Sequence, residues 1–376
     1  IDAGAAKFPC ILTVDLNTGE QPLVESALNA LLNGAAIDAP IPNPTRWDRY
    51  DYNDAWSSWN APMARSAGGN NGVSFVQMLG YRQVILYTGA APVGSMETAD
   101  FNLMSDWLTS ITCGVNASRQ GFVGAGDHLA GILTEINPSF LVNRLGGAEL
   151  CDAYHSSGCG PASPPDESAC VRLEPASSAP YAPLSDSDLF GNWCPQSYAF
   201  DVLRAVGGGI GNRVYRDYDR TPPLDTNYAQ VVRSVLGSGS DNYRSVLTGY
   251  ALSHLSTHDA NDECVGDEVH TVPAIVDELR AALRWIYGGD ANVPSLCESP
   301  CVCCVDVDPA TPEIARRRDT CSLISRKNSG CNALRAPGRP IEQGSTGKRM
   351  EQNSLKLPQR QGGNAGRAGE TPGERC

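Results

Sequence analysis

Residues 119–130 read Arg-Gln-Gly-Phe-Val-Gly-Ala-Gly-Asp-His-Leu-Ala, and this stretch decides the fold that we expect. It has the pattern of a short buried strand, a glycine-rich turn and the start of a helix. Many α/β enzymes display a nucleophile at such a strand-to-helix turn. The stretch therefore predicts an α/β fold and poses the question of whether the turn carries a catalytic residue.

The alternation of strands and helices continues on both sides of this stretch. Apolar runs predict further strands at residues 8–16, 46–52, 82–89, 198–206, 228–236 and 243–255. Apolar positions at helical spacing predict a helix that contains Leu23 to Leu32, a helix that begins after an N-cap at Ser95, and a closing helix that ends at Gly288 and Gly289. Strands alternating with amphipathic helices predict a doubly wound, mainly parallel sheet with helices on both faces.

Composition divides the chain into three parts. We expect one α/β domain at residues 1–289, interrupted at 151–195 by a cysteine- and proline-rich insertion, then a cysteine-rich linker at 290–312. Residues 313–376 have few apolar residues and no sustained period, so this tail is expected to be disordered. Two alternatives remain for the tail: a basic arm for an anionic partner, or a natural C-terminal module read in a shifted frame.

Charge is distributed unevenly along the chain. The formal net charge is -13, and the tail holds 13 Lys/Arg against 6 Asp/Glu, a net of +7, which leaves -20 for residues 1–312. An acidic body repels nucleic acid and anionic membranes, and no apolar stretch of eighteen residues is present. We therefore expect no nucleic-acid partner and no membrane insertion.

Fourteen cysteines indicate an oxidising compartment. Cys297, Cys301, Cys303 and Cys304 lie close enough together to chelate a soft metal, but their spacing is not that of paired CxxC knuckles. Disulfides are therefore favoured over zinc, and an extracellular or periplasmic location over a cytosolic one.

The order of the motifs resembles a known fold. The segments ILTVDLN, YRQVILYTG, METADFNLMSDWL, GFVGAGDHLAGIL and PSFLVNRLGGAELCDAY, with the later YRSVLTGYALSHL and ALRWIYGG, resemble the class I glutamine-amidotransferase-like, flavodoxin-like α/β domain of secreted bacterial proteins. The resemblance covers roughly residues 8–289 without the insertion. It implies a cysteine at the turn, but the corresponding position is Gly126, which has no thiol or hydroxyl.

Other residues at the same sheet edge could still perform chemistry. Ligands of parallel sheets bind beyond the carboxyl ends of the strands, which here carry polar residues and glycines at Asp15, Asn17, Thr88, Gly89, Gly126, Asp127 and His128. The resemblance places His254 near the position of the family's histidine. The candidate catalytic residues are therefore Asp127, His128 and His254, with Asp127 as a base. The favoured alternative is that Asp127 caps the following helix and His128 lies on the surface.

The acidic segment at residues 254–270 is a candidate metal site. Its possible ligands are His258, Asp259, Asp262 and Glu263, and calcium is favoured over zinc in an extracellular setting. No HExxH or EF-hand spacing is present, so a solvated acidic loop is favoured over either metal. Calcium is the one cofactor considered.

Two function classes remain. The favoured one is a non-catalytic extracellular or cell-surface binding or structural domain, with an unidentified protein or glycan partner, because the turn lacks a nucleophile. The alternative is a secreted hydrolase that uses Asp127, His128 and His254, with or without a metal.

Overall fold

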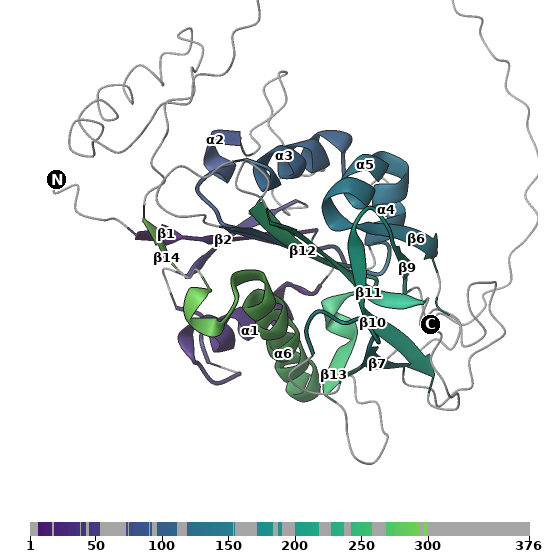
Figure 1. Ribbon diagram of the computed structural model, residues 1–376. Coiled ribbons are helices and arrows are strands. Elements are labelled where there is room, and N and C mark those ends of the chain that lie inside the picture. The colour runs from purple at the N-terminus through teal and green to yellow at the C-terminus, as the bar shows by residue number, and fades with distance from the viewer. Residues whose placement is uncertain are drawn as a thin grey trace, which may run out of the picture. The chain divides into compact units, whose positions relative to one another are not determined.

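The computed structural model describes residues 7–16, 19–37, 39–42, 45–52, 73, 75–89, 91, 96–110, 119–152, 154, 171–182, 187–189, 200–217, 227–236, 242–257, 268–293 and 296–298. All of them lie in the first of the two units into which the chain divides, Ile1–Val305 (Figure 1). Of the linker expected at 290–312 only residues 290–293 and 296–298 are described, and the tail expected at 313–376 lies outside the described residues.

The described elements follow one another in a mixed order. The helices are α1 (Gln21–Asn33), α2 (Phe75–Met78), α3 (Thr98–Leu108), α4 (Leu129–Ile136), α5 (Pro138–Phe140), a π-helix (Leu141–Leu145), α6 (Glu268–Tyr287) and two 3₁₀ turns (Leu252–His254 and Asp290–Asn292). The strands are β1 (Lys7–Pro9), β2 (Ile11–Asp15), β3 (Trp47–Asp51), β4 (Gln83–Tyr87), β5 (Gln120–Ala125), β6 (Gly147–Cys151), β7 (Val171–Pro175), β8 (Ser187–Leu189), β9 (Val202–Ala205), β10 (Gly209–Asp217), β11 (Tyr228–Leu236), β12 (Asn242–Thr248), β13 (Leu255–Thr257) and β14 (Leu296–Glu298).

One sheet of 12 strands forms the centre of the fold, in the order β13-β8-β7-β10-β11-β12-β5-β4-β2-β3, with β9 and β6 attached beside β11. The strands from β12 to β3 pair in parallel. All pairs from β12 outward through β11, β10, β7, β8 and β13 are antiparallel, as are β9 with β11 and β6 with β9.

The expectation of a doubly wound, mainly parallel sheet is therefore wrong. Strand β12 is the point of change, because it pairs in parallel with β5 on one side and antiparallel with β11 on the other. Parallel neighbours need a long crossover, whereas antiparallel neighbours can follow one another directly along the chain. Residues 198–255 contain successive strand patterns with no amphipathic helix between them, and β9, β10, β11 and β12, which lie in this range, pair antiparallel with one another.

The expected insertion at 151–195 is described only in part. Its described residues contribute two strands to the main sheet, because β7 pairs with β10 and β8 pairs with β7. The remaining part of this segment, including Cys159, Cys170 and Cys194, lies outside the described residues.

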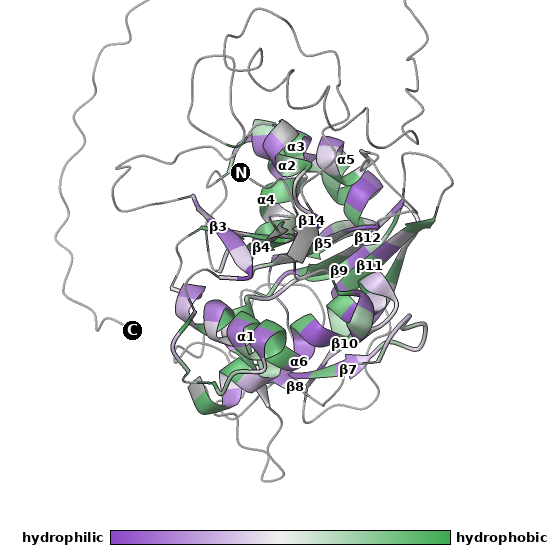
Figure 2. Cartoon of the chain, turned by 90° about the vertical axis from the view of Figure 1, so that its left-hand side faces the viewer, coloured by the Kyte–Doolittle hydropathy of each residue, from purple (hydrophilic) through white to green (hydrophobic). Residues whose placement is uncertain are grey.

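Helices cover both faces of the parallel strands, as Figure 1 shows. Alternate residues of each strand enter two separate cores: Ile11, Ile85 and Val123 pack with α1 and α6, whereas neighbouring residues such as Leu86 and Phe122 pack with α2, α3, α4 and α5. Strands buried on both faces are apolar along their whole length. In Figure 2 both α1 and α6 carry apolar and polar residues along their length.

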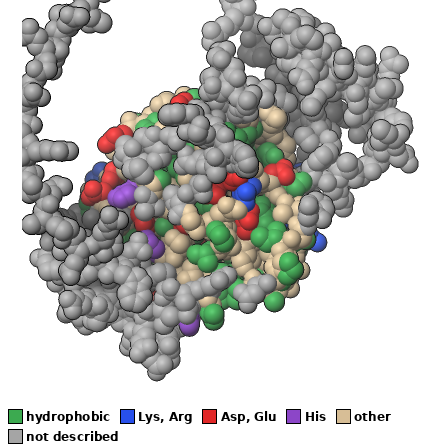
Figure 3. Space-filling model, turned by 180° about the vertical axis from the view of Figure 1, so that it is seen from behind, with side chains coloured by type: hydrophobic (Ala, Val, Ile, Leu, Met, Phe, Trp, Pro, Cys, Tyr) green, Lys and Arg blue, Asp and Glu red, His purple; other side chains and the backbone are tan. Residues whose placement is uncertain are grey.

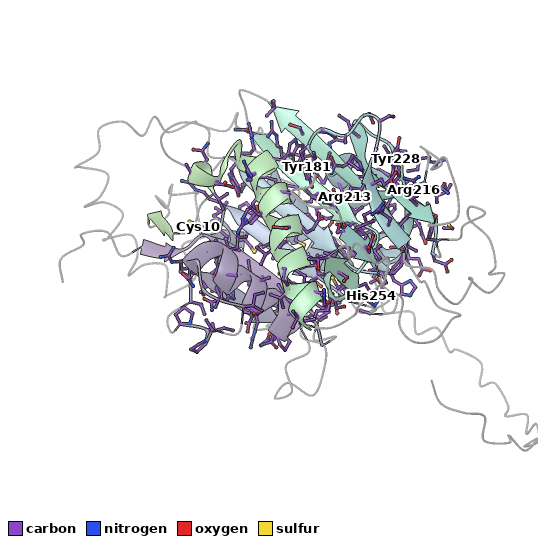
Figure 4. The ribbon with its side chains drawn as sticks, turned by 90° about the horizontal axis from the view of Figure 1, so that it is seen from below. Cys10, Tyr181, Arg213, Arg216, Tyr228 and His254 are labelled. Atoms are coloured by element: carbon purple, nitrogen blue, oxygen red, sulfur yellow. The ribbon has the colours of Figure 1, made fainter. Side chains whose placement is uncertain are left out.

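A buried polar network joins the antiparallel strands to α6. Arg213 of β10 lies 2.9 Å from Glu278 of α6, and the Gln230 amide of β11 donates to Glu278 at 2.6 Å. Asn212 in turn donates to Gln230 at 2.6 Å, as does the Tyr181 hydroxyl at 3.0 Å. Figure 4 shows Arg213 and Tyr181 beside this helix.

Cys10 and Cys151 are each disulfide-bonded, while the pairing of the other cysteines stays a prediction. Among the described helices, none combines the length and the apolar character that crossing a membrane requires.

Candidate functional site

The glycine-rich turn at residues 124–128 joins β5 to α4 at the carboxyl edge of the parallel strands, as the sequence predicts. The turn is held to the end of β4, because the Asp127 N–H donates to the Gly89 carbonyl at 2.9 Å and the Thr88 N–H donates to the Ala125 carbonyl at 2.9 Å. Thr88 and Asp127 are both buried. The turn is therefore a packed part of the fold.

Gly126 has no room for a side chain. A Cβ atom at this position would collide with the Thr88 hydroxyl oxygen and would lie 3.2 Å from the Gly89 carbonyl oxygen. The resemblance to amidotransferases implies a cysteine here, but the Thr88 side chain fills the space that it would need. Because Thr88 itself is fully buried, its hydroxyl does not offer an accessible replacement.

Asp127 and His254 come together, although they lie on separate strand ends. Oδ1 of Asp127 is 3.3 Å from Nδ1 of His254 and accepts the Ala251 N–H at 2.7 Å. Burial lowers the pKa of His254, but the contact with Asp127 and the charges of Asp127 and Glu20 outweigh this effect, so the net pKa is raised. A single carboxylate oxygen thus holds both the ring and the backbone of the loop after β12.

Glu20 is a third member of this group that the sequence reasoning missed. It precedes α1, and its Oε1 accepts the Ser253 N–H at 2.8 Å. Burial raises its pKa to about 7, the Asp127 charge adds to that increase, and the Ser253 hydrogen bond opposes it. The signal in the sequence was an acidic residue in the β2–α1 connection, at the same sheet edge as Asp127.

Asp201 supplies the cap of α4, a role that the sequence suggested for Asp127. Its Oδ2 accepts the Ala130 N–H at 2.8 Å, and its carboxylate also interacts with the Gly131 N–H. Burial raises its pKa well above the usual range, and the nearby charges of Glu149 and Asp127 raise it further. The proposed capping by Asp127 is therefore wrong, because its carboxylate is directed at the loop after β12.

We call Glu20, Asp127, Asp201 and His254 the carboxyl-edge cluster. Their carboxylates accept main-chain N–H groups from two segments, the loop after β12 at Ala251 and Ser253 and the start of α4 at Ala130. The ring of His254 also packs edge-on against Phe200, with 5.4 Å between the ring centroids. The cluster thus fastens the loop after β12 and the start of α4 to the rest of the edge.

His128, the remaining catalytic candidate, lies apart from this pair. It is half-buried, its charge acts on Glu149, and within the described residues no hydrogen bond or ion pair of its ring is recorded. Asp15 is buried at the end of β2, while Asn17 lies outside the described residues.

The predicted calcium ligands His258, Asp259, Asp262 and Glu263 also lie outside the described residues. Across the part of the chain that the structure describes, no three His, Cys, Asp or Glu side chains are placed to hold a metal ion. The calcium hypothesis therefore stays a prediction.

Comparisons with known proteins give no match: no family model matches the chain, and no curated protein or solved structure matches it significantly. No finding thus bears on the resemblance to class I glutamine amidotransferases, which stays a prediction.

Proposed function

We propose that this domain is a non-catalytic binding or structural module of an extracellular or cell-surface protein, with a protein or glycan partner. Fourteen cysteines support an extracellular setting. The cysteine that the amidotransferase resemblance implies is replaced by Gly126, and the packing of Thr88 excludes any side chain there.

One observation carries this proposal: the acidic side chains of the carboxyl-edge cluster bind the protein's own backbone. Asp127 accepts from Ala251, Glu20 from Ser253 and Asp201 from Ala130. A buried N–H group that loses its acceptor costs about 1–3 kcal/mol. These residues therefore have a structural role that accounts for their burial and position without a substrate.

The test is a comparison of activity and stability in the same variants. The purified wild-type protein and the variants Asp127→Asn and His254→Gln are each incubated with p-nitrophenyl esters, a phosphomonoester and glutamine. We expect no turnover above the buffer rate in any of the three proteins, and a lower melting temperature in both variants. Turnover by the wild type that Asp127→Asn abolishes at an unchanged melting temperature would overturn the proposal.

A second candidate function is supported by the contact between Asp127 and His254. A buried histidine held at 3.3 Å from a carboxylate, with a raised pKa, is the arrangement of a general acid or base. On this reading the chain is a secreted hydrolase in which Asp127 orients His254 and water is the nucleophile. His128 would have only an auxiliary role, because it lies apart from Asp127 and His254 and its charge acts on Glu149.

The dependence of turnover on pH separates the two candidates. A general base at His254 requires activity that rises with pH through the pKa of His254 and disappears in His254→Gln. Phe200→Leu serves as a matched control, because it removes the ring packed against His254 and keeps the imidazole. A hydrolase would retain turnover in this control, and equal background rates in all three proteins would eliminate the second candidate.

A further inference from the structure

Two arginines meet at the amino edge of the parallel strands, opposite the carboxyl-edge cluster. Arg119 immediately precedes β5, and Arg244 lies near the start of β12, where it is in register with Gly121. Positions 119 and 121 lie on one face of the strand, so both guanidinium groups point to the same side of the sheet. Arg119 donates to the Ile286 carbonyl at 2.8 Å, and Arg244 donates to the Trp285 carbonyl.

This amino-edge pair, Arg119 and Arg244, is separated from the carboxyl-edge cluster by the length of α6. Its contacts are at the last turn of that helix, which also holds Trp285 against Tyr181. In Figure 4, Tyr181 and His254 lie toward opposite ends of α6. A site at the amino edge is therefore independent of whether the carboxyl edge is catalytic.

Within the described residues, the two charges of this pair are not matched by a carboxylate, although the body as a whole is acidic. Some other arginines of the described chain form ion pairs, as between Arg213 and Glu278 at 2.9 Å and between Arg49 and Glu25 at 2.7 Å, whereas others donate only to neutral groups. Within the described residues, neither Arg119 nor Arg244 forms an ion pair. Figure 3 shows one face of this body, on which Asp and Glu side chains recur and Lys and Arg side chains are sparse.

The helix end offsets only part of the two positive charges. The C-terminal end of a helix carries about -0.5 of an elementary charge, whereas the two guanidinium groups carry two positive charges. Burial lowers the pKa of Arg244, and the neighbouring charge of Arg119 lowers it further, as expected for like charges held together. An anion at this point would relieve that repulsion.

The pair also has hydrogen-bond donors left for a ligand. Each guanidinium has five N–H groups. Nε of Arg119 is buried and has no acceptor in the described part of the chain. Arg244 is fixed in position by the Trp285 ring, 4.9 Å from its guanidinium carbon, and by Ser234, which accepts from its Nε at 3.1 Å. Both groups are thus held in place by protein contacts before any ligand arrives.

We propose that Arg119 and Arg244 form a binding site for a single oxyanion group, either a carboxylate or a sulfate, at the amino edge of the sheet beside the end of α6. The planar guanidinium forks suit such groups, because each can donate two parallel hydrogen bonds to their oxygen atoms. This inference does not rest on the proposed function.

The test measures the melting temperature of the full chain as sodium sulfate or sodium acetate replaces sodium chloride at constant ionic strength. Wild type is compared with Arg119→Gln and Arg244→Gln, and with Arg216→Gln as a control that removes an arginine paired with Glu174. Arg244→Lys keeps the charge and covers the case in which a glutamine variant fails to fold. Isothermal titration with the same two salts gives the affinity directly.

We expect a saturable rise in melting temperature for wild type and for Arg216→Gln, and an affinity weaker by about tenfold in Arg119→Gln and Arg244→Gln, the loss of one charge-assisted hydrogen bond. A stronger response to acetate would identify a carboxylate ligand, and a stronger response to sulfate a sulfated one. Sulfate also stabilises proteins by exclusion from their surface, without saturation. A non-saturating response that is equal in all variants would overturn the proposal.

Discussion

Two buried polar networks of this domain provide partners for their buried polar groups in different ways. The antiparallel strands are joined to α6 by side chains that match one another in charge, with Arg213 against Glu278. The carboxyl-edge cluster collects three acids with one histidine, and its carboxylates accept backbone N–H groups. A backbone N–H group is neutral at every pH. The stability of the carboxyl-edge cluster therefore depends on which of its acids are ionised.

The largest expected effect is at the charge-matched network. Glu278→Gln leaves Arg213 as a buried charge without a carboxylate, and breaking a buried pair in this way costs about 3–5 kcal/mol. The variant Glu174→Gln removes the partner of Arg216 from a pair that is only half-buried, so it should cost about 1 kcal/mol or less. Urea denaturation of both variants measures the difference, and equal costs would show that burial does not distinguish the two pairs.

A dependence on pH should mark the carboxyl-edge cluster. The pKa of Glu20 is about 7 in the folded protein, above its usual 4.5, so its contribution to stability is complete below pH 4.5 and is lost as the pH rises through 7. The loss amounts to about 3 kcal/mol. The raised pKa of His254 acts in the same direction.

Glu20→Gln tests this dependence, because the amide can still accept from Ser253 but does not ionise. Its stability relative to wild type, measured by urea denaturation from pH 5 to pH 8.5, should increase with pH. Glu135→Gln changes an exposed acid and should show no such trend. If the Glu20→Gln difference is constant with pH, then Glu20 is ionised throughout the range and its burial has been misjudged.

The packing at the turn predicts a smaller effect. Gly126→Ala forces a methyl group against the Thr88 hydroxyl, and such overpacking costs about 1–3 kcal/mol. In the double variant with Thr88→Ala the worst contact is removed, so the cost should be less than the sum of the two single changes. Thermal unfolding of the four proteins gives this coupling; additive costs would contradict the crowding of Gly126 by Thr88.

The smallest effect is expected at the cap of α4. Asp201→Ala should cost about 0.5–2 kcal/mol, whereas Asp201→Asn should cost much less, because its amide oxygen can still accept the Ala130 N–H. Burial raises the pKa of this carboxyl well above its usual range and so disfavours its charged form, which is why the loss of charge should matter less than the loss of the hydrogen bond. A large cost for Asp201→Asn would show that the charge of Asp201, and not its hydrogen bond to Ala130, stabilises the start of α4.

The sequence predicted the individual strands better than their directions. The apolar runs of β2, β4 and β5 and the periodic face of α6 are local signals, and the structure has these elements at the expected places. The direction of pairing is not local: Val246 of β12 faces Val123 on one side and Val232 on the other, in opposite strand orientations. The sequence patterns therefore predict parallel pairing for strands that the structure pairs antiparallel.

The same limit applied to the candidate site. Asp127 and His254 could be placed at one edge from the strand pattern, but Asp201 lies in an apolar segment, YAFDVLRA, where nothing local indicates a partner 71 positions away. The acceptor of a buried N–H group is chosen by packing in three dimensions. This is why the capping role was assigned to Asp127, the nearest acid in the sequence.

The position of β12 has a consequence for the order in which the domain can form. Strand β5 borders β4, which precedes it, and β12, which follows only after the entire set of antiparallel strands from β6 to β11. Asp127 and its backbone donor at Ala251 are 124 positions apart. During synthesis from the N-terminus, the apolar edge of β5 is thus left open until the last strands emerge, so a chain stalled before β12 presents an unpaired edge to other nascent chains.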